Sequence, residues 1–256
     1  MRVLITGANG LIGRVLWDGL AGRHSLHGID LRSDRSRGIR RADVRRARSI
    51  RSAFDQVDAI VDLATGSTVD LPWDRVEEDI EGRINVLEAA RLHDVRRYVF
   101  ASSNHVTGMY ELDHPYAAIV AGAYEGLNPA ATPLIRTDWP IRPDSAYGVG
   151  KAFSEAAARF YAEQYDMSCI CIRIGTVNAE DRPKTPRHYA TLLSQGDLVR
   201  LVGCALSAPP ELRYGIYYGV SANTWRLWDV ANAAKELDFV PQDDAERFRS
   251  GADVRA

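Results

Sequence analysis

Brief apolar runs, rich in β-branched and aromatic residues, alternate along the first 174 residues with longer amphipathic segments. Such runs are typical of strands buried on both faces of a parallel sheet, and parallel strands need crossover connections that are usually helices. The alternation therefore predicts a doubly wound α/β fold with right-handed crossovers. The expected strands are Val3–Thr6, Leu26–Asp30, Ala59–Leu63, Arg97–Ala101 and Ser168–Ile174, and the expected helices are about Leu11–Leu20, Ile50–Gln56, Asp74–His93 and Ala146–Tyr165.

The pattern changes after residue 174. We expect a helix near Tyr189–Leu206, a strand around Gly215–Val220 and a short helix over Asp229–Leu237. This order is interpreted as a small C-terminal cap on a single domain, with residues 1–175 mainly the core and 176–256 mainly the cap. A second irregular stretch, Tyr110–Pro143, is rich in glycine, proline and aromatic residues. Both segments follow the carboxyl ends of strands, the edge at which open α/β sheets bind ligands.

Composition excludes several classes of function. The 256 residues include 32 Lys+Arg and 34 Asp+Glu, and a formal charge of −2 gives no general attraction to nucleic acid or to anionic membranes. No apolar run approaches membrane-spanning length and the N-terminus lacks a signal-peptide pattern, so a cytoplasmic protein is expected. Cys169, Cys171 and Cys204 are too few for a disulfide framework and lack partners at zinc spacing, so we expect buried thiols and no metal.

A glycine-rich turn follows the first expected strand. Gly7-Ala8-Asn9-Gly10-Leu11-Ile12-Gly13 leads directly into a helix, so the backbone can turn tightly and a pyrophosphate can approach the amides at the helix N-terminus. Asp30 closes the second strand, where a carboxylate can accept hydrogen bonds from both ribose hydroxyls and repel a 2′-phosphate. The sequence thus predicts a Rossmann-type site that prefers NAD, although Arg32 could bind the extra phosphate of NADP.

Tyr147 and Lys151 form a Y-x-x-x-K pair at the start of an expected helix, on one face of it. The ammonium would lower the pKa of the phenol, and the phenolate could accept the proton of an alcohol. Taken alone, such a pair is common on protein surfaces. Ser103, in Phe100-Ala101-Ser102-Ser103-Asn104-His105 at the end of the preceding strand, favours the catalytic interpretation because its hydroxyl can hold the reacting oxygen.

Topology places further cofactor contacts. Asp43 and Val44 lie where the third strand should end, and Leu63, Ala64 and Thr65 lie at the end of the fourth. The full predicted set of cofactor contacts is Gly7, Asn9, Gly10, Leu11, Ile12, Gly13, Asp30, Leu31, Asp43, Val44, Leu63, Ala64, Thr65, Tyr147, Lys151 and Ile174.

The glycine turn, Ser103, Tyr147 and Lys151, in this order, resemble the extended short-chain dehydrogenase/reductase superfamily over nearly the whole chain. Its nucleotide-sugar epimerases and dehydratases usually have a longer C-terminal part. The tighter resemblance is to uronate dehydrogenases and related NAD-dependent aldose dehydrogenases, which act on C1 of free or phosphorylated sugars. It is carried by Phe100–His105 with Gly108, Tyr147–Val149 with Lys151, Arg173–Gly175, Leu193-Ser194 with Asp197, Tyr218–Asn223 and Pro241–Glu246.

The resemblance implies that Tyr147 takes the proton of an anomeric hydroxyl while hydride passes from C1 to NAD, which gives an aldonolactone. Lys151 would also anchor the nicotinamide ribose. Arg187 would hold an anionic group at C6, so a uronic acid is the expected substrate. His105 could instead be a core histidine, and Arg173 is interpreted as structural. The implied substrate contacts are Ser67, Ser103, Asn104, His105, Thr176 and Arg187.

Two features depart from the resemblance. Asp79 stands where the family usually has asparagine, which we interpret as a matter of local helix packing, and the Tyr110–Pro143 stretch is closer to aldose-phosphate relatives. An aldose phosphate, a sulfonated aldose or a neutral aldose therefore stays open as the substrate. A nucleotide-sugar epimerase or dehydratase and a non-catalytic NAD-binding regulatory protein also stay open as functions. A homo-oligomer is expected, because look-alikes commonly dimerise through the two helices that flank the sheet.

Overall fold

The structure, a computed structural model, describes residues 1–249. Within these residues, seven parallel strands form one sheet in the order β3-β2-β1-β4-β5-β6-β7. The direction of strand addition reverses between β1 and β4, which confirms the predicted doubly wound arrangement and creates a ligand crevice at that point. The strands are β1 (Arg2–Thr6), β2 (Ser25–Asp30), β3 (Ile39–Arg41), β4 (Ala59–Asp62), β5 (Arg97–Ser103), β6 (Ser168–Ile174) and β7 (Tyr214–Gly219).

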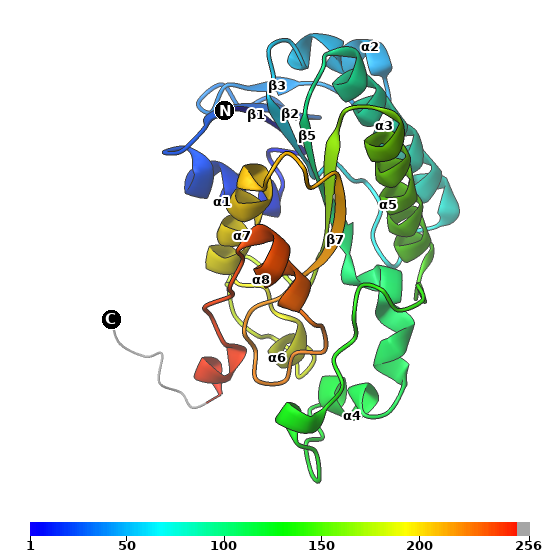
Figure 1. Ribbon diagram of the computed structural model, residues 1–256, viewed down its shortest axis with the longest axis vertical. Helices are drawn as coiled ribbons and strands as arrows, with labels where there is room; N and C mark the ends of the chain where they lie inside the picture. The colour runs from blue at the N-terminus through cyan, green and yellow to red at the C-terminus, as the bar shows by residue number, and fades with distance from the viewer. Residues whose placement is uncertain (250–256) are drawn as a thin grey trace.

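Helices cover both faces of the sheet (Figure 1). Side chains alternate along each strand, so that Val3 and Ile5 pack into the apolar cluster on one face and Leu4 into the cluster on the other. This double burial explains why the central strands are apolar throughout. The first face is covered by α1 (Leu11–Leu20), α7 (Gln195–Ser207) and α8 (Ala231–Leu237), and the second by α2 (Ala47–Ile50), α3 (Trp73–Leu92) and α5 (Ala146–Gln164).

Strand β5 extends further than β4 at the carboxyl edge of the sheet. Asp62 ends β4 opposite Phe100, whereas β5 continues from Phe100 to Ser103. Ser103 pairs in register with Ile174, the last residue of β6. The Ser103 hydroxyl is therefore carried past the end of β4, toward the crevice.

The helix predicted over Tyr189–Leu206 is wrong as a single helix. It is divided into α6 (His188–Thr191) and α7, and the two leucines between them are extended. They pair with the chain that leaves β6, where the backbone N–H of Leu193 donates to the carbonyl of Thr176 at 2.8 Å. Ser194 then caps α7 with its side chain.

Two other predicted elements differ from those observed. The strand predicted at Gly215–Val220 within a cap is β7, which pairs with β6 and completes the main sheet. The helix predicted over Ile50–Gln56 is replaced by the short α2 and a 3-10 turn, Arg51–Ala53. The cap boundary after residue 175 stays a prediction, but part of the segment assigned to the cap belongs to the sheet.

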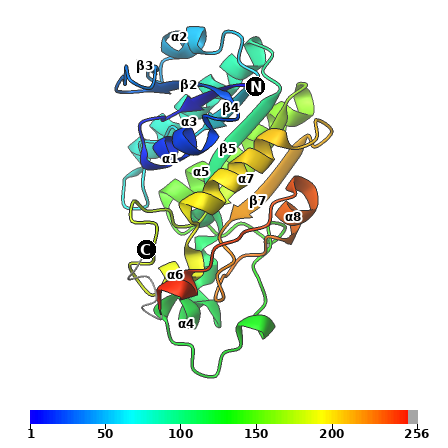
Figure 2. The same cartoon turned by 90° about the vertical axis from the view of Figure 1, so that its left-hand side faces the viewer.

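A third apolar cluster lies beyond the carboxyl ends of the strands, at the lower end of the molecule in Figures 1 and 2, where α4 (Tyr116–Ala121) and α6 are found. Trp228 is buried there and stacks on Tyr218 with ring centres 5.6 Å apart. Ile135 forms a parallel bridge to Trp228. The irregular stretch 110–143 is thus packed against C-terminal residues.

The cysteines are free thiols. Cys169 and Cys171 are buried on β6, as expected, whereas Cys204 on α7 is partly exposed. Within residues 1–249 no group of three or more His, Cys, Asp and Glu side chains is arranged to hold a metal ion. Over the same range, no helix combines the length and the apolar character needed to cross a membrane.

Candidate active site

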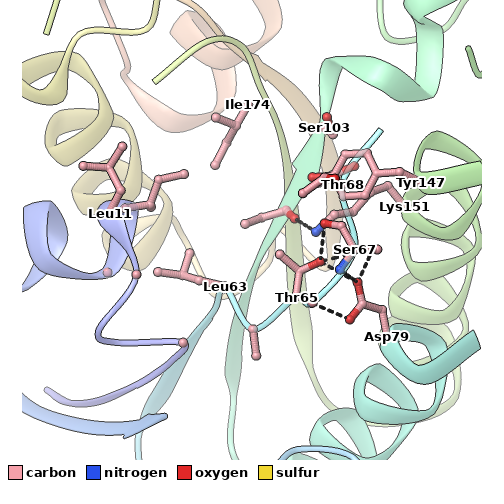
Figure 3. Close-up of a pocket in the computed structure, with 18 of the residues that line it drawn as sticks. Leu11, Leu63, Thr65, Ser67, Thr68, Asp79, Ser103, Tyr147, Lys151 and Ile174 are labelled. Carbon is pink, nitrogen blue, oxygen red and sulfur yellow. Dashed lines mark hydrogen bonds between the residues drawn. The ribbon is translucent and has the colours of Figure 1, made fainter. Parts of the chain in front are cut away.

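A cleft of about 740 Å³ is lined by residues at the carboxyl ends of β1, β2, β4, β5 and β6. Figure 3 shows Leu11 and Leu63 on one side of it and Tyr147 and Lys151 on the other. The structure brings all the predicted cofactor and substrate contacts into this lining except Asn9. The residues concerned are Gly7, Gly10, Leu11, Ile12, Gly13, Asp30, Leu31, Asp43, Val44, Leu63, Ala64, Thr65, Ser67, Ser103, Asn104, His105, Tyr147, Lys151, Ile174, Thr176 and Arg187.

The glycine turn fits a dinucleotide. Gly7 has a φ of +65°, and a Cβ at this position would also lie 3.1 Å from the backbone of Ala64, so a side chain would be strained and crowded. Helix α1 begins after Gly10 with no side-chain cap and no acidic residue in its first turn. Its N-terminal amides therefore face the cleft free for an anion such as a pyrophosphate.

Asp30 is held in place for a ribose. Its carboxylate accepts the backbone N–H of Asn9 at 3.0 Å and that of Arg32 at 3.2 Å. Asn9 thus positions Asp30 from outside the cleft lining, and its own side chain donates to the carbonyl of Arg32 at 2.6 Å. Asp30 lines the cleft and Arg32 is not among the described residues that do. This arrangement favours NAD over NADP.

The first turn of α5 lies directly against the chain that follows Ser103. Ser145 caps the helix by accepting the N–H of Gly148 at 3.2 Å. A Cβ on Gly148 would lie 2.3 Å from the carbonyl oxygen of His105, so only glycine allows this approach. As a result the Ser103 hydroxyl lies close enough to the Tyr147 phenol to favour its charged form.

A buried ion pair fixes the same helix further along. Arg173 on β6 donates to both carboxylate oxygens of Glu155 on α5, at 2.9 and 2.8 Å. The Ser102 hydroxyl donates to Glu155 at 2.6 Å. These contacts confirm the structural role of Arg173, because they join α5 to β5 and β6 one turn beyond Lys151.

The electrostatics of the Tyr147–Lys151 pair differ from the sequence expectation. Burial raises the pKa of Tyr147, against the effects of the neighbouring Ser103 hydroxyl and the charge of Arg83. Burial, together with the Arg83 charge, lowers the pKa of Lys151 to about 7. Lys151 Nζ donates to the carbonyl of Ala101 at 2.8 Å and lies 5.4 Å from the centre of the Tyr147 ring. In this structure the ammonium does not bring the pKa of Tyr147 below its ordinary value.

Arg83 is a residue that the sequence reasoning missed. It is buried on α3, forms an ion pair with Asp62, and donates to the carbonyl of Ala64 at 2.9 Å. Its guanidinium lies 4.5 Å from the centre of the Phe100 ring. A single arginine on the apolar face of an expected helix was the available signal, since an arginine is rarely buried without a partner.

His105 lines the cleft rather than the core. Its Nδ1 lies 2.7 Å from Oδ2 of Asp144, and its ring centre lies 5.9 Å from that of Tyr147. Burial would raise the pKa of Asp144, but the hydrogen bond and charge of His105 hold it below its ordinary value. In a neutral ring that donates from Nδ1, Nε2 is left as an acceptor for a substrate hydroxyl. Sequence reasoning did not identify Asp144.

Asp79 anchors the loop that follows β4. Its carboxylate accepts hydrogen bonds from the hydroxyl of Thr65 at 2.5 Å, the N–H of Gly66 at 2.7 Å and the N–H of Ser67 at 3.1 Å (Figure 3). It also accepts the hydroxyl of Ser67. The departure from asparagine therefore concerns a cleft loop and the predicted sugar contact Ser67, and the interpretation as helix packing is wrong.

Arg187 lies in the cleft near Asn104 and Thr176, where the resemblance placed it. It is not free, because its guanidinium donates to both oxygens of the Glu111 carboxylate, at 2.6 and 2.7 Å. Glu111 was not identified from the sequence. The signal was its position in Gly108-Met109-Tyr110-Glu111, directly after the Ser103–His105 segment.

The model of the NAD dependent epimerase/dehydratase family matches residues 3–196. The chain belongs to this family. Three curated relatives cover nearly all of it. A uronate dehydrogenase of Pseudomonas syringae pv. tomato is 33% identical, with 99% of this chain and 86% of that protein covered. An NAD-dependent glucose-6-phosphate dehydrogenase of Haloferax volcanii is 31% identical, covering 96% and 95%. An L-arabinose 1-dehydrogenase (NAD(P)(+)) of the same organism is 32% identical, covering 95% and 97%.

Solved structures agree with these relatives. A mutant of a uronate dehydrogenase from Agrobacterium tumefaciens, complexed with NAD, superposes with a TM-score of 0.81 at 31% identity and covers 98% of this chain and 88% of that one. The predicted family and its use of NAD are confirmed. The roles assigned to individual site residues stay predictions.

Proposed function

We propose that the protein is an NAD-dependent dehydrogenase that oxidises the C1 hydroxyl of a cyclic aldose to the aldonolactone. The observation that supports it most directly is that Ser103, Tyr147 and Lys151 line the same cleft as an uncapped, glycine-rich helix N-terminus. The dehydrogenase names of the relatives support the reaction type. The sugars in the names of these relatives differ, so the names do not identify the chemical group that the substrate carries at the end remote from C1.

The glycine turn, Asp30 and the Leu63–Thr65 segment would hold NAD, which when bound supplies an acceptor for the hydride of C1. Tyr147 would accept the proton of the C1 hydroxyl, and Ser103 would hold the same oxygen. Because burial raises the pKa of Tyr147, proton acceptance becomes more favourable as the pH rises, so oxidation should accelerate from neutral to alkaline pH. Lys151 would orient Tyr147 and bind the ribose.

The test is NADH formation by the purified protein. Neutral aldoses, uronic acids, aldose phosphates, sulfonated aldoses and nucleotide sugars are offered with NAD or NADP, and absorbance of the reduced nucleotide is followed. Net NADH with a free or phosphorylated aldose is expected. No net NADH, with conversion of a nucleotide sugar to its epimer, would instead identify an epimerase. NAD binding without turnover of any compound would identify a regulatory protein.

Tyr147→Phe removes only the phenolic hydroxyl. Loss of general-base catalysis should lower kcat by about 10²–10⁴-fold. The control is Tyr165→Phe, which makes the same chemical change at the far end of α5. Turnover by Tyr147→Phe at the rate of the unmodified protein, with Tyr165→Phe also unaffected, would refute the mechanism.

A further inference from the structure

The carboxylate-binding side of Arg187 is already occupied. Nε and Nη2 form the planar fork that binds a carboxylate with two parallel hydrogen bonds, and here they donate to the two oxygens of Glu111. The Glu111 side chain is only 11% exposed and that of Arg187 30% exposed. The pair is thus largely withdrawn from solvent, which strengthens the attraction and makes its separation costly.

Two more of the five N–H groups of Arg187 are directed at neighbours, which leaves one N–H on Nη1 for a ligand. When the Asn104 amide is oriented to satisfy both of its ends, its nitrogen donates to the carbonyl of Ile174 at 3.0 Å and its oxygen accepts from Nη2 of Arg187 at 2.7 Å. Nη1 lies 3.4 Å from the hydroxyl of Thr176. A second carboxylate could not approach Arg187 with two hydrogen bonds unless Asn104 moved.

The charges around the substrate end of the cleft also disfavour an anionic substrate. The Glu111 carboxylate forms an ion pair with Arg187. The Asp144 carboxylate contacts the ring of His105, and the Asp79 carboxylate accepts a hydrogen bond from the Ser67 hydroxyl. The three arginines that line the cleft within residues 1–249 all pair with carboxylates: Arg45 with Asp43 and Glu78, Arg75 with Glu78, and Arg187 with Glu111. A substrate anion beside Arg187 would also lie beside the Glu111 carboxylate, and like charges at close range repel strongly.

A sugar hydroxyl fits this group better than an anion. It can accept a hydrogen bond from Nη1 of Arg187 and donate its own hydrogen to a carboxylate oxygen of Glu111. We propose that the Glu111–Arg187 pair selects an aldose that is uncharged at the end remote from C1. This inference rests on the proposed function and narrows it, because it replaces the uronic acid expected from sequence by a neutral aldose.

The test compares sugars that differ only at C6, which is a neutral CH2OH group in one and a carboxylate in the other. kcat/KM for NAD reduction is measured with D-galactose against D-galacturonate and with D-glucose against D-glucuronate. For each pair that is turned over, kcat/KM should be at least about tenfold larger for the neutral sugar than for the uronate, since repulsion by an adjacent like charge costs several times RT. A larger kcat/KM for the uronate would overturn the inference and leave the proposed function standing. No NADH from any aldose would overturn both.

The substitution Glu111→Gln tests whether the Glu111 charge is the cause of the preference for a neutral sugar. The substitution keeps the shape of the side chain but leaves Arg187 with its full charge, so the ratio of neutral to uronate kcat/KM should fall by at least about tenfold. Glu125→Gln makes the same change at an exposed position in stretch 110–143 and should leave the ratio unchanged. Stabilisation of each variant by NAD in thermal unfolding shows that it is folded. A folded Glu111→Gln protein with an unchanged ratio would overturn the inference.

Discussion

At the scale of single residues, the most unusual group in the cleft is the Lys151 ammonium. It is buried, it donates to the Ala101 carbonyl, and its pKa is lowered to about 7. A pKa below the unfolded value of 10.5 means that folding disfavours the charged form. The resulting cost to stability is fully present below pH 7, shrinks between pH 7 and 10.5, and is absent above that range. Lys151 thus reduces stability in exchange for a role at the site.

Lys151→Met keeps the length of the side chain and removes the charge. We expect it to abolish turnover and to raise Tm at pH 6.5, with a smaller gain at pH 9.5, because the penalty for burying the ammonium has by then declined. Tm is measured at both pH values for the variant, for the unmodified protein and for Lys235→Met, an exposed control. A gain of equal size at both pH values, or a loss of stability at pH 6.5, would contradict the explanation.

At the scale of secondary-structure elements, the site depends on how closely α5 approaches the end of β5. Gly148→Ala places a methyl group 2.3 Å from the His105 carbonyl, so the first turn of α5 must move outward and carry Tyr147 away from Ser103. A displacement of about 1 Å can cost about 10²-fold in rate, and we expect kcat to fall by that order while NAD still stabilises the protein. Gly22→Ala, at a position with open space, is the control. Unchanged kcat in Gly148→Ala would show that the contact is not needed.

The secondary-structure elements also show which features of the fold and of the site can be predicted from sequence patterns. The apolar runs, the glycine turn and the Y-x-x-x-K spacing were enough to place the strands at the cleft and its cofactor end, because these depend on local periodicity. The substrate contacts Ser67, Thr176 and Arg187 were instead implied by the family resemblance. The Glu111–Arg187 pair joins residues 76 positions apart, and no local pattern reports such a contact. The break between α6 and α7 was missed for a similar reason, since it follows from pairing with the chain after β6.

At the scale of the whole molecule, the helices on one side of the sheet leave several large apolar side chains exposed. Helices α3 and α5 lie next to each other on one side (Figure 1). On α5, Val149, Phe153 and Phe160 are exposed and recur at helical spacing on one face. On α3, Trp73 and Ile84 are exposed eleven positions apart, which again places them on one face. Large apolar side chains grouped in this way are typical of protein interfaces.

We therefore expect the protein to form a dimer through α3 and α5, in agreement with the homo-oligomer predicted from sequence. Phe153→Glu with Phe160→Glu should convert the dimer to a monomer, because two charges would have to be buried in each copy's contact face. Light scattering after size-exclusion chromatography measures the mass, and Leu112→Glu, an exposed leucine outside these helices, is the control. Since α5 also carries Tyr147 and Lys151, kcat should decrease when the dimer is converted to a monomer. A monomeric unmodified protein would contradict the prediction.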